Sequence, residues 1–214
     1  MRQRLLAATL LAVLSACALP GGQRTPSTIY APDPRVAADP SWPEVNWQLS
    51  LAQPTAARMI DGYRIAVRPI PNELQVYRGA SWAKTPGDML QDAILRTLED
   101  SGRLPAVARQ GVGFVADYRL FLDLRRFESD YAGRAVPAAV IEVSAKLVHG
   151  PDQEIVASRT FLHAEPATSP DVPQVVEAFS RSLGAIARDV SGWVLESGET
   201  HERTAHSRAR ASSP

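Results

Sequence analysis

Two long segments of the chain alternate between apolar and polar residues, and this period of two constrains the fold more than any other feature. In residues 116–127, large apolar side chains from Tyr118 to Leu124 share one face, and charged side chains share the other. Residues 139–147 repeat the alternation, and residues 154–164 follow after a turn with apolar residues on both faces. A period of two is typical of half-buried strands. These two strands and the third segment, with short connections, predict an antiparallel meander with one solvated face.

Two further segments repeat their apolar residues at helical spacing. The first has Thr85 as N-cap, Pro86 at the first helical position and Gly102 as its stop. These residue types satisfy or remove the free N–H groups at the start of a helix and accept the left-handed conformation after its end. The second helix follows Asp171 as N-cap and carries an apolar stripe as far as Trp193.

Two shorter strands are predicted before the first helix, at residues 62–69 and 74–78, because both alternate and both are bounded by turn residues. Strands joined mainly to their sequence neighbours, with two helices between and after them, indicate an α+β fold. We therefore predict a mostly antiparallel sheet with two main helices packed on one face.

The first residues resemble a lipoprotein signal. A basic start with Arg2 and Arg4 precedes an apolar run at residues 5–14, which is too short to remain as a membrane-spanning helix. Small residues then precede Cys17, the only cysteine of the chain. This lipobox pattern predicts cleavage before Cys17 and a lipid on its thiol; an ordinary secretory signal is the alternative. Because residue 18 is Ala18 rather than aspartate, the lipoprotein is expected at the outer membrane, facing the periplasm.

Composition divides the chain into four parts. Residues 1–16 are the expected signal peptide, and residues 17–46 are a lipidated tether rich in proline. Residues 47–197 carry the periodic segments and form the expected domain. Residues 198–214 are polar and are expected to be a disordered tail.

The sequence offers no catalytic or metal constellation. Basic and acidic residues number 23 each, so charge gives no reason to expect nucleic-acid binding. None of the four histidines has the spacing of a helical zinc motif, and His201 and His206 lie in the expected tail. We expect no catalytic residues, no metal, no cofactor and no enzymatic activity.

Two aromatic residues stand before the first helix. Tyr77 and Trp82 flank a short polar stretch that ends at the N-cap. A tryptophan in this position is typically a packing residue, and that is the favoured interpretation of Trp82. Tyrosine and tryptophan are also preferred anchors of protein interfaces, so both are kept as interface candidates.

Together with the lipobox, four motifs resemble the ABC-type transport auxiliary lipoprotein family, the relatives of paraquat-inducible protein C and the YmbA-like lipoproteins. In order, the motifs are Tyr77-x4-Trp82-Ala83-x2-Pro86-x2-Met89-Leu90, Leu98-Glu99-x-Ser101-Gly102, Ala116-Asp117-Tyr118-x-Leu120 and Phe127-Glu128. The resemblance covers residues 47–195 and leaves out the proline-rich leader and the tail.

The resemblance implies an accessory lipoprotein of an ABC transport system whose substrate-binding subunit carries a mammalian cell entry (MCE) domain. Such systems move lipids between the inner and outer membranes. It implies an MCE-domain partner, a possible homo-oligomeric ring and no catalytic residues. Two alternatives remain open: a lipoprotein that carries a lipid in its own apolar cavity, and a chaperone or plug of an outer-membrane barrel.

Overall fold

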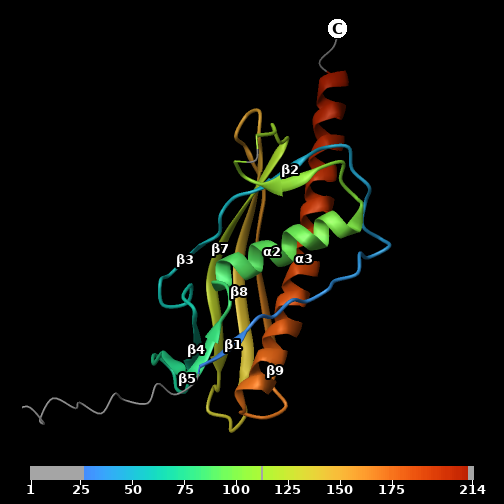
Figure 1. The fold of residues 1–214 in the computed structure, drawn as a ribbon. Helices are drawn as coiled ribbons and strands as arrows, with labels where there is room; N and C mark the ends of the chain where they lie inside the picture. Colours follow the sequence, from blue (N-terminus) through green and yellow to red (C-terminus); the bar gives the residue numbers. More distant parts are fainter. Residues whose placement is uncertain (1–26, 112, 212–214) are drawn as a thin grey trace, which may run out of the picture.

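The structure, a computed structural model, describes residues 27–111 and 113–211. Within these residues nine strands form one open sheet, and two helices cover one of its faces (Figure 1). The long ladders of the sheet are antiparallel, while several short strands join it in parallel. The predicted α+β class, with two main helices on one face of a mostly antiparallel sheet, is confirmed.

The predicted meander forms the long-stranded part of the sheet. Its strands are β7 (Tyr118–Asp130), β8 (Ala138–His149) and β9 (Ile155–Pro166), paired antiparallel in chain order, with β9 as an edge strand. The apolar face of β7 is buried against the helices, and its charged face is turned to solvent, as the alternation requires.

Three short strands share the other edge of β7. They are β2 (Leu49–Leu51), β3 (Thr55–Ala56) and β4 (Arg64–Arg68), and each runs parallel to β7. They follow β7 from its first residues to its last, so residues 49–68 act as one interrupted strand. Only β4 was predicted, because strands of two or three residues carry no measurable period.

The two ends of the sheet are completed by three more strands. At one end β5 (Gln75–Trp82) pairs antiparallel with β4, and β1 (Thr28–Tyr30) pairs parallel with β5. At the opposite end β6 (Val107–Arg109) pairs parallel with β2.

Helix α2 (Pro86–Ser101) has the predicted ends. The Thr85 side chain accepts a hydrogen bond from the backbone N–H of Asp88, and Gly102 takes a left-handed conformation at φ 62°. Its inward face packs on the sheet and on the second helix.

Helix α3 (Val172–Ala211) begins after Asp171 as predicted but does not end near residue 197. The expected disordered tail is therefore wrong from residue 198 to residue 211. Contacts outside the helix account for the extension: Gly198 lies against the indole of Trp47, and the side chains of His201 and Glu202 bond to Tyr118.

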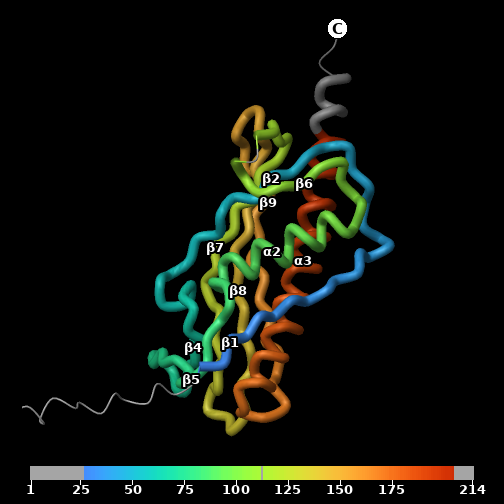
Figure 2. Tube along the Cα trace, viewed as in Figure 1, coloured from blue at the N-terminus to red at the C-terminus, as the bar shows by residue number. Residues whose placement is uncertain are grey.

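The described part of the proline-rich segment, residues 27–46, also differs from its prediction as a tether. After β1, it crosses the helices on its way to β2 at the other end of the sheet (Figure 2). Trp42 and Val45 are buried in the core, and Pro34 contacts Gly184 of α3. Proline prevents regular ladders but not apolar burial, so the folded unit extends to residue 28.

Among the described residues, no helix combines the length and the apolar composition that a bilayer span requires.

Candidate functional sites

The expected lipid attachment site, Cys17, lies outside the described residues. The described chain starts one residue before β1, at the end of the sheet where β1, β5 and β4 lie together. Any anchor in the leader is therefore connected to the molecule at this end.

Trp82 is a core residue. Its side chain is 2% exposed, and its ring packs edge-on against Phe127 and Phe179, with centroids 5.9 and 5.2 Å away. A side chain enclosed in this way has no surface to offer a partner. Trp82 is thus a packing residue, and the interface interpretation of it is wrong.

Tyr77 lies on β5 and is half-buried against the edge of the core. Its hydroxyl is 3.0 Å from Oγ of Ser129 on β7, and burial raises the pKa of the Tyr77 phenol to about 12. The ring is held in one place while part of it stays accessible. Tyr77 remains a predicted interface residue.

A buried ion-pair network adjoins Tyr77. Glu128 is 1% exposed and receives two hydrogen bonds from the Arg68 guanidinium, at 2.8 and 3.0 Å. Arg126 bonds to the same carboxylate and to Asp130. The hydrogen bond to Glu128 raises the pKa of Arg68 above its usual value. Because Arg68 lies on β4 and Glu128 on β7, the network fixes these parallel strands in register.

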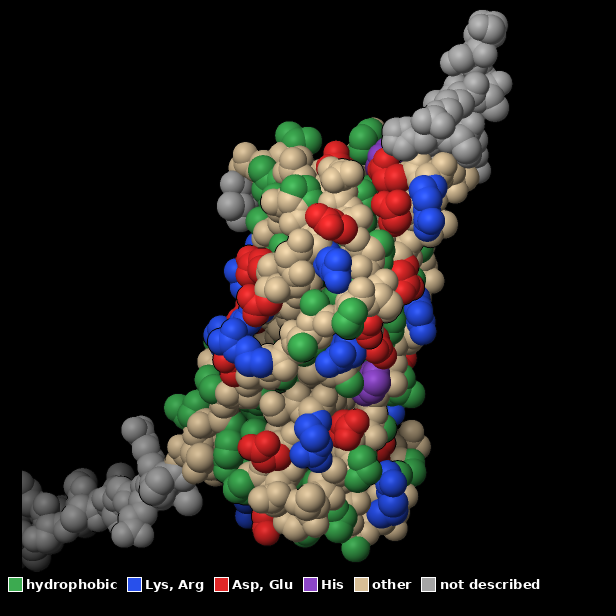
Figure 3. Space-filling view, turned by 90° about the vertical axis from the view of Figure 1, so that its right-hand side faces the viewer, with side chains coloured by type: hydrophobic (Ala, Val, Ile, Leu, Met, Phe, Trp, Pro, Cys, Tyr) green, Lys and Arg blue, Asp and Glu red, His purple; other side chains and the backbone are tan. Residues whose placement is uncertain are grey.

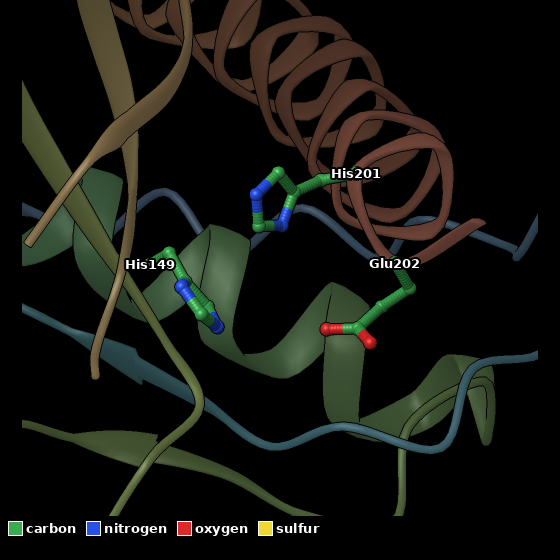
Figure 4. Close-up of side chains that lie close together, drawn as sticks. All are labelled: His149, His201 and Glu202. Carbon is green, nitrogen blue, oxygen red and sulfur yellow. The ribbon is translucent and has the colours of Figure 1, made fainter. Parts of the chain in front are cut away.

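A second polar cluster lies at the opposite end of β7. His149 at the end of β8 and two consecutive residues of α3, His201 and Glu202, turn their side chains toward a shared space (Figure 4). One nitrogen or oxygen atom of each lies within 4.8 Å of those of the other two. All three side chains are partly exposed. Two imidazoles and a carboxylate are a donor set that can hold a transition metal.

Hydrogen bonds orient this cluster. Nδ1 of His149 is 2.9 Å from a carboxylate oxygen of Asp152, and Nδ1 of His201 is 2.7 Å from the Tyr118 hydroxyl. That hydroxyl also donates to Oε1 of Glu202 at 2.7 Å. Burial, followed by the Glu202 hydrogen bond, raises the pKa of Tyr118 far above its usual value, so the phenol stays protonated and donates.

Sequence reasoning missed this cluster. His149 follows the predicted strand at residues 139–147 and His201 lies in the expected tail, and neither belongs to a short ligand motif. They meet only because β8 ends beside the extension of α3, which no local pattern indicates. The one available signal was Tyr118, a buried strand residue with a polar end that needs a partner.

The face of the molecule seen in Figure 3 mixes positive and negative side chains, without a large area of one sign. Some of the exposed apolar side chains lie at the end of the sheet formed by β1, β5 and β4. Four of them lie in β1, in the loop before β4 or directly after β4, and form what we call the β1–β4 surface: Ile29, Met59, Tyr63 and Ile70. Strand β5, which carries Tyr77, lies between β1 and β4.

Residues 28–191 match the family described as the ABC-type transport auxiliary lipoprotein component. The match starts at β1 and ends within α3. It therefore includes residues 28–46, part of the segment predicted to be a tether.

Similar proteins of known structure agree with this match. Protein XCC0632 of Xanthomonas campestris is 52% identical, with a TM-score of 0.79 over 82% of this chain and 99% of that one. An uncharacterized protein at 15% identity shares the fold, with a TM-score of 0.61 over 78% of this chain and 97% of its own.

A curated relative, the uncharacterized protein bll6063 of Bradyrhizobium diazoefficiens, is 26% identical over 147 residues. The match covers 69% of this chain but 39% of the relative. The chain thus spans about two fifths of the length of that protein.

Proposed function

The chain belongs to the ABC-type transport auxiliary lipoprotein family, and from this premise we propose that it is a non-enzymatic accessory subunit of an MCE-type ABC lipid transport system. In this proposal it is anchored to the outer membrane through Cys17, faces the periplasm and acts through protein–protein contacts. The observation that carries the proposal is the family match over residues 28–191, which takes in nearly all of the folded unit.

The β1–β4 surface is the proposed site of these contacts. Ile29 is 67% exposed and Tyr63 is 61% exposed, although both are large and apolar. Exposed apolar side chains that gather on one part of a protein are typical of contact sites. Tyr77 lies on β5, the strand between β1 and β4, and its hydrogen bond to Ser129 orders its partly accessible ring, as in interface anchors.

Protein contacts fit the described surface better than a lipid cavity does. A groove of about 470 Å³ beside α3 is lined mainly by polar residues, among them Glu154, Glu196 and Thr200. A second groove, of about 360 Å³, lies between residues 31–34 and α2 and includes Lys84, Asp92 and Arg96. The polar wall of the first groove is unsuited to acyl chains, while the second groove combines apolar residues with these charges.

The direct test is binding of the full-length lipoprotein, purified in detergent, to the purified MCE-domain subunit from the same organism. We expect a measurable complex, which Tyr77→Ala and Tyr63→Ala each weaken by ~1–2 kcal/mol, the range for an interface anchor. Phe121→Ala is the matched control, since Phe121 is 40% exposed on β7 and lies outside the β1–β4 surface.

Other outcomes identify the alternatives. Lipid that co-purifies with the protein, without MCE binding, indicates the carrier; capture of an outer-membrane barrel indicates the chaperone or plug. For the anchor, Cys17→Ser should leave the protein unlipidated and outside the outer-membrane fraction. Continued palmitate labelling of that variant would show that Cys17 is not the lipid site.

A further inference from the structure

His149, His201 and Glu202 place two imidazoles and one carboxylate together from elements that are distant in sequence (Figure 4). This donor set, with a fourth position left to water, is the composition of zinc sites that use three protein ligands. We propose that these three residues bind a zinc ion that joins the end of β8 to the extension of α3. The inference does not rest on the transport role.

The orientation of His149 supports the assignment. Ligating histidines in proteins donate their other ring N–H to a carboxylate, a carbonyl or a similar acceptor, which fixes the tautomer. Here Nδ1 of His149 bonds to Asp152, and Nδ1 of His201 bonds to the hydroxyl of Tyr118. With its proton on Nδ1, His149 carries its lone pair on Nε2, its ligand atom in this proposal. His201 turns Nδ1 toward the shared space (Figure 4), so zinc takes the place of the Tyr118 hydrogen bond at that nitrogen.

Glu202 is oriented in the same way. The Tyr118 hydroxyl accepts from His201 and donates to Oε1 of Glu202, so one buried phenol holds two ligands at once. Tyr118 itself is fully buried and pairs with His149 across the β7–β8 ladder. His201 and Glu202 are thus held by a buried residue of the sheet, as metal ligands are held by a supporting shell.

The distances suit a small cation. Zinc–nitrogen and zinc–oxygen bonds of about 2.1 Å at tetrahedral angles place ligand atoms about 3.4 Å apart. The ligand atoms all lie within 4.8 Å of one another, so each separation must close by at most about 1.4 Å. Partly exposed side chains with rotatable bonds can make this adjustment without movement of the strands. The His149 and His201 rings are already neighbours, with centroids 4.9 Å apart.

A bound ion would act as a cross-link. The side chains of His201 and Glu202 connect the extension of α3 to Tyr118 of β7. An ion that binds only the folded arrangement stabilises that arrangement by mass action. Zinc should therefore raise the melting temperature and protect the backbone amides of α3 around residue 201 from exchange.

The experiment uses the full-length protein in detergent, with the Cys17 thiol acylated and metal removed by a chelator. Zinc alone is titrated against a chromophoric chelator, and cobalt(II) is used to record the visible spectrum of a tetrahedral site. We expect one zinc per chain. His149→Ala and His201→Ala should each weaken binding by roughly tenfold or more, and Asp152→Asn by roughly 10–100-fold through loss of its hold on His149.

His163→Ala is the matched control. His163 lies on β9 and bonds through Nε2 to Asp189 of α3 at 2.8 Å, so it is another His–Asp pair outside the cluster. It should bind zinc as the unaltered protein does. The proposal requires two results from each ligand variant. Without zinc it melts at the same temperature as the unaltered protein, and with zinc its melting temperature does not rise.

The proposal is overturned if no stoichiometric zinc binds. It is equally overturned if zinc binds with the same affinity after His149 and His201 are replaced. If a histidine variant does not fold, Asp152→Asn is the deciding variant. It removes neither a ligand nor a buried group, because the Asp152 carboxylate is exposed.

Discussion

A β-carbon added to Gly192 would lie 2.6 Å from Nε1 of Trp42. Helix α3 therefore passes directly over the indole ring of the N-terminal segment, and only glycine allows this approach. The same holds for Gly198, whose added β-carbon would overlap the ring of Trp47. Glycines that weaken an isolated helix are here the points where the N-terminal segment fits against it.

Gly192→Ala should destabilise the protein, by roughly 1–3 kcal/mol, because the new methyl group overlaps Trp42. The sign is informative, since the same change in an exposed helix stabilises by up to about 1 kcal/mol. Urea denaturation measures the difference. Trp42→Ala in the same chain should remove most of the extra cost of Gly192→Ala, and additive effects in this double-mutant cycle would refute the contact.

Removal of the residues before 47 should cost several kcal/mol. Trp42 and Val45 are 6% and 3% exposed, and burial of a large apolar side chain contributes about 1.5–3 kcal/mol. A chain that starts at residue 47 is compared by chemical denaturation with one that starts at residue 27. Equal stability of the two would mean that the segment does not pack on the helices in solution.

Glu128→Gln should destabilise by about 3–5 kcal/mol, because it leaves Arg68 and Arg126 facing each other without their shared buried carboxylate. The control is Glu142→Gln on β8, whose partner Arg125 is 3.7 Å away and about half exposed. An exposed pair of that kind contributes about 0–1 kcal/mol. Similar losses of unfolding free energy for the two variants would show that the Glu128 network contributes no more than an exposed ion pair.

Asp92 should contribute to the loss of stability in acid. Burial opposes ionisation of Asp92, but hydrogen bonds from Lys84 and Arg109 outweigh it and hold the pKa of Asp92 below its usual value. A carboxyl with a lowered folded pKa stabilises the fold above its unfolded pKa, and this contribution is lost as pH falls through the folded pKa.

Asp92→Asn should therefore cost about 1 kcal/mol or less near pH 7, since the partners are partly exposed. The difference from the unaltered protein should shrink as pH falls below about 4. Denaturation at several pH values measures it, and an NMR titration of Asp92 in Lys84→Met should show a higher pKa. A difference that grows in acid would contradict the assignment.

The parts of the fold that sequence could predict are those governed by local pattern. The meander and helix α2 follow from alternation and from Thr85, Pro86 and Gly102, whose effects act within a few residues. Strands β1, β2, β3 and β6 could not be predicted, because two or three residues have no period and become strands only through their neighbours.

The predicted domain boundaries near residues 47 and 197 differ from the structure for a related reason. Proline content indicated a tether before residue 47. Whether Trp42 packs against α3, however, depends on a glycine of that helix, which is far away in the sequence. The same applies to the candidate sites. Trp82 was correctly favoured as a packing residue, whereas the meeting of His149 with His201 depends wholly on where β8 ends relative to α3.

The two ends of the sheet lie at opposite ends of the long axis of the molecule. Residue 27 lies by β1, while α3 continues past the far end of β7, where His149 and His201 meet (Figure 1). The 40 residues of α3 span about 60 Å, and the ten residues from Cys17 to 27 reach at most about 35 Å. With a lipid on Cys17, the β1 end of the molecule stays close to the lipid headgroups. Helix α3 then acts as a spacer that holds the end with His149 and His201 away from that membrane, toward partners across the aqueous space.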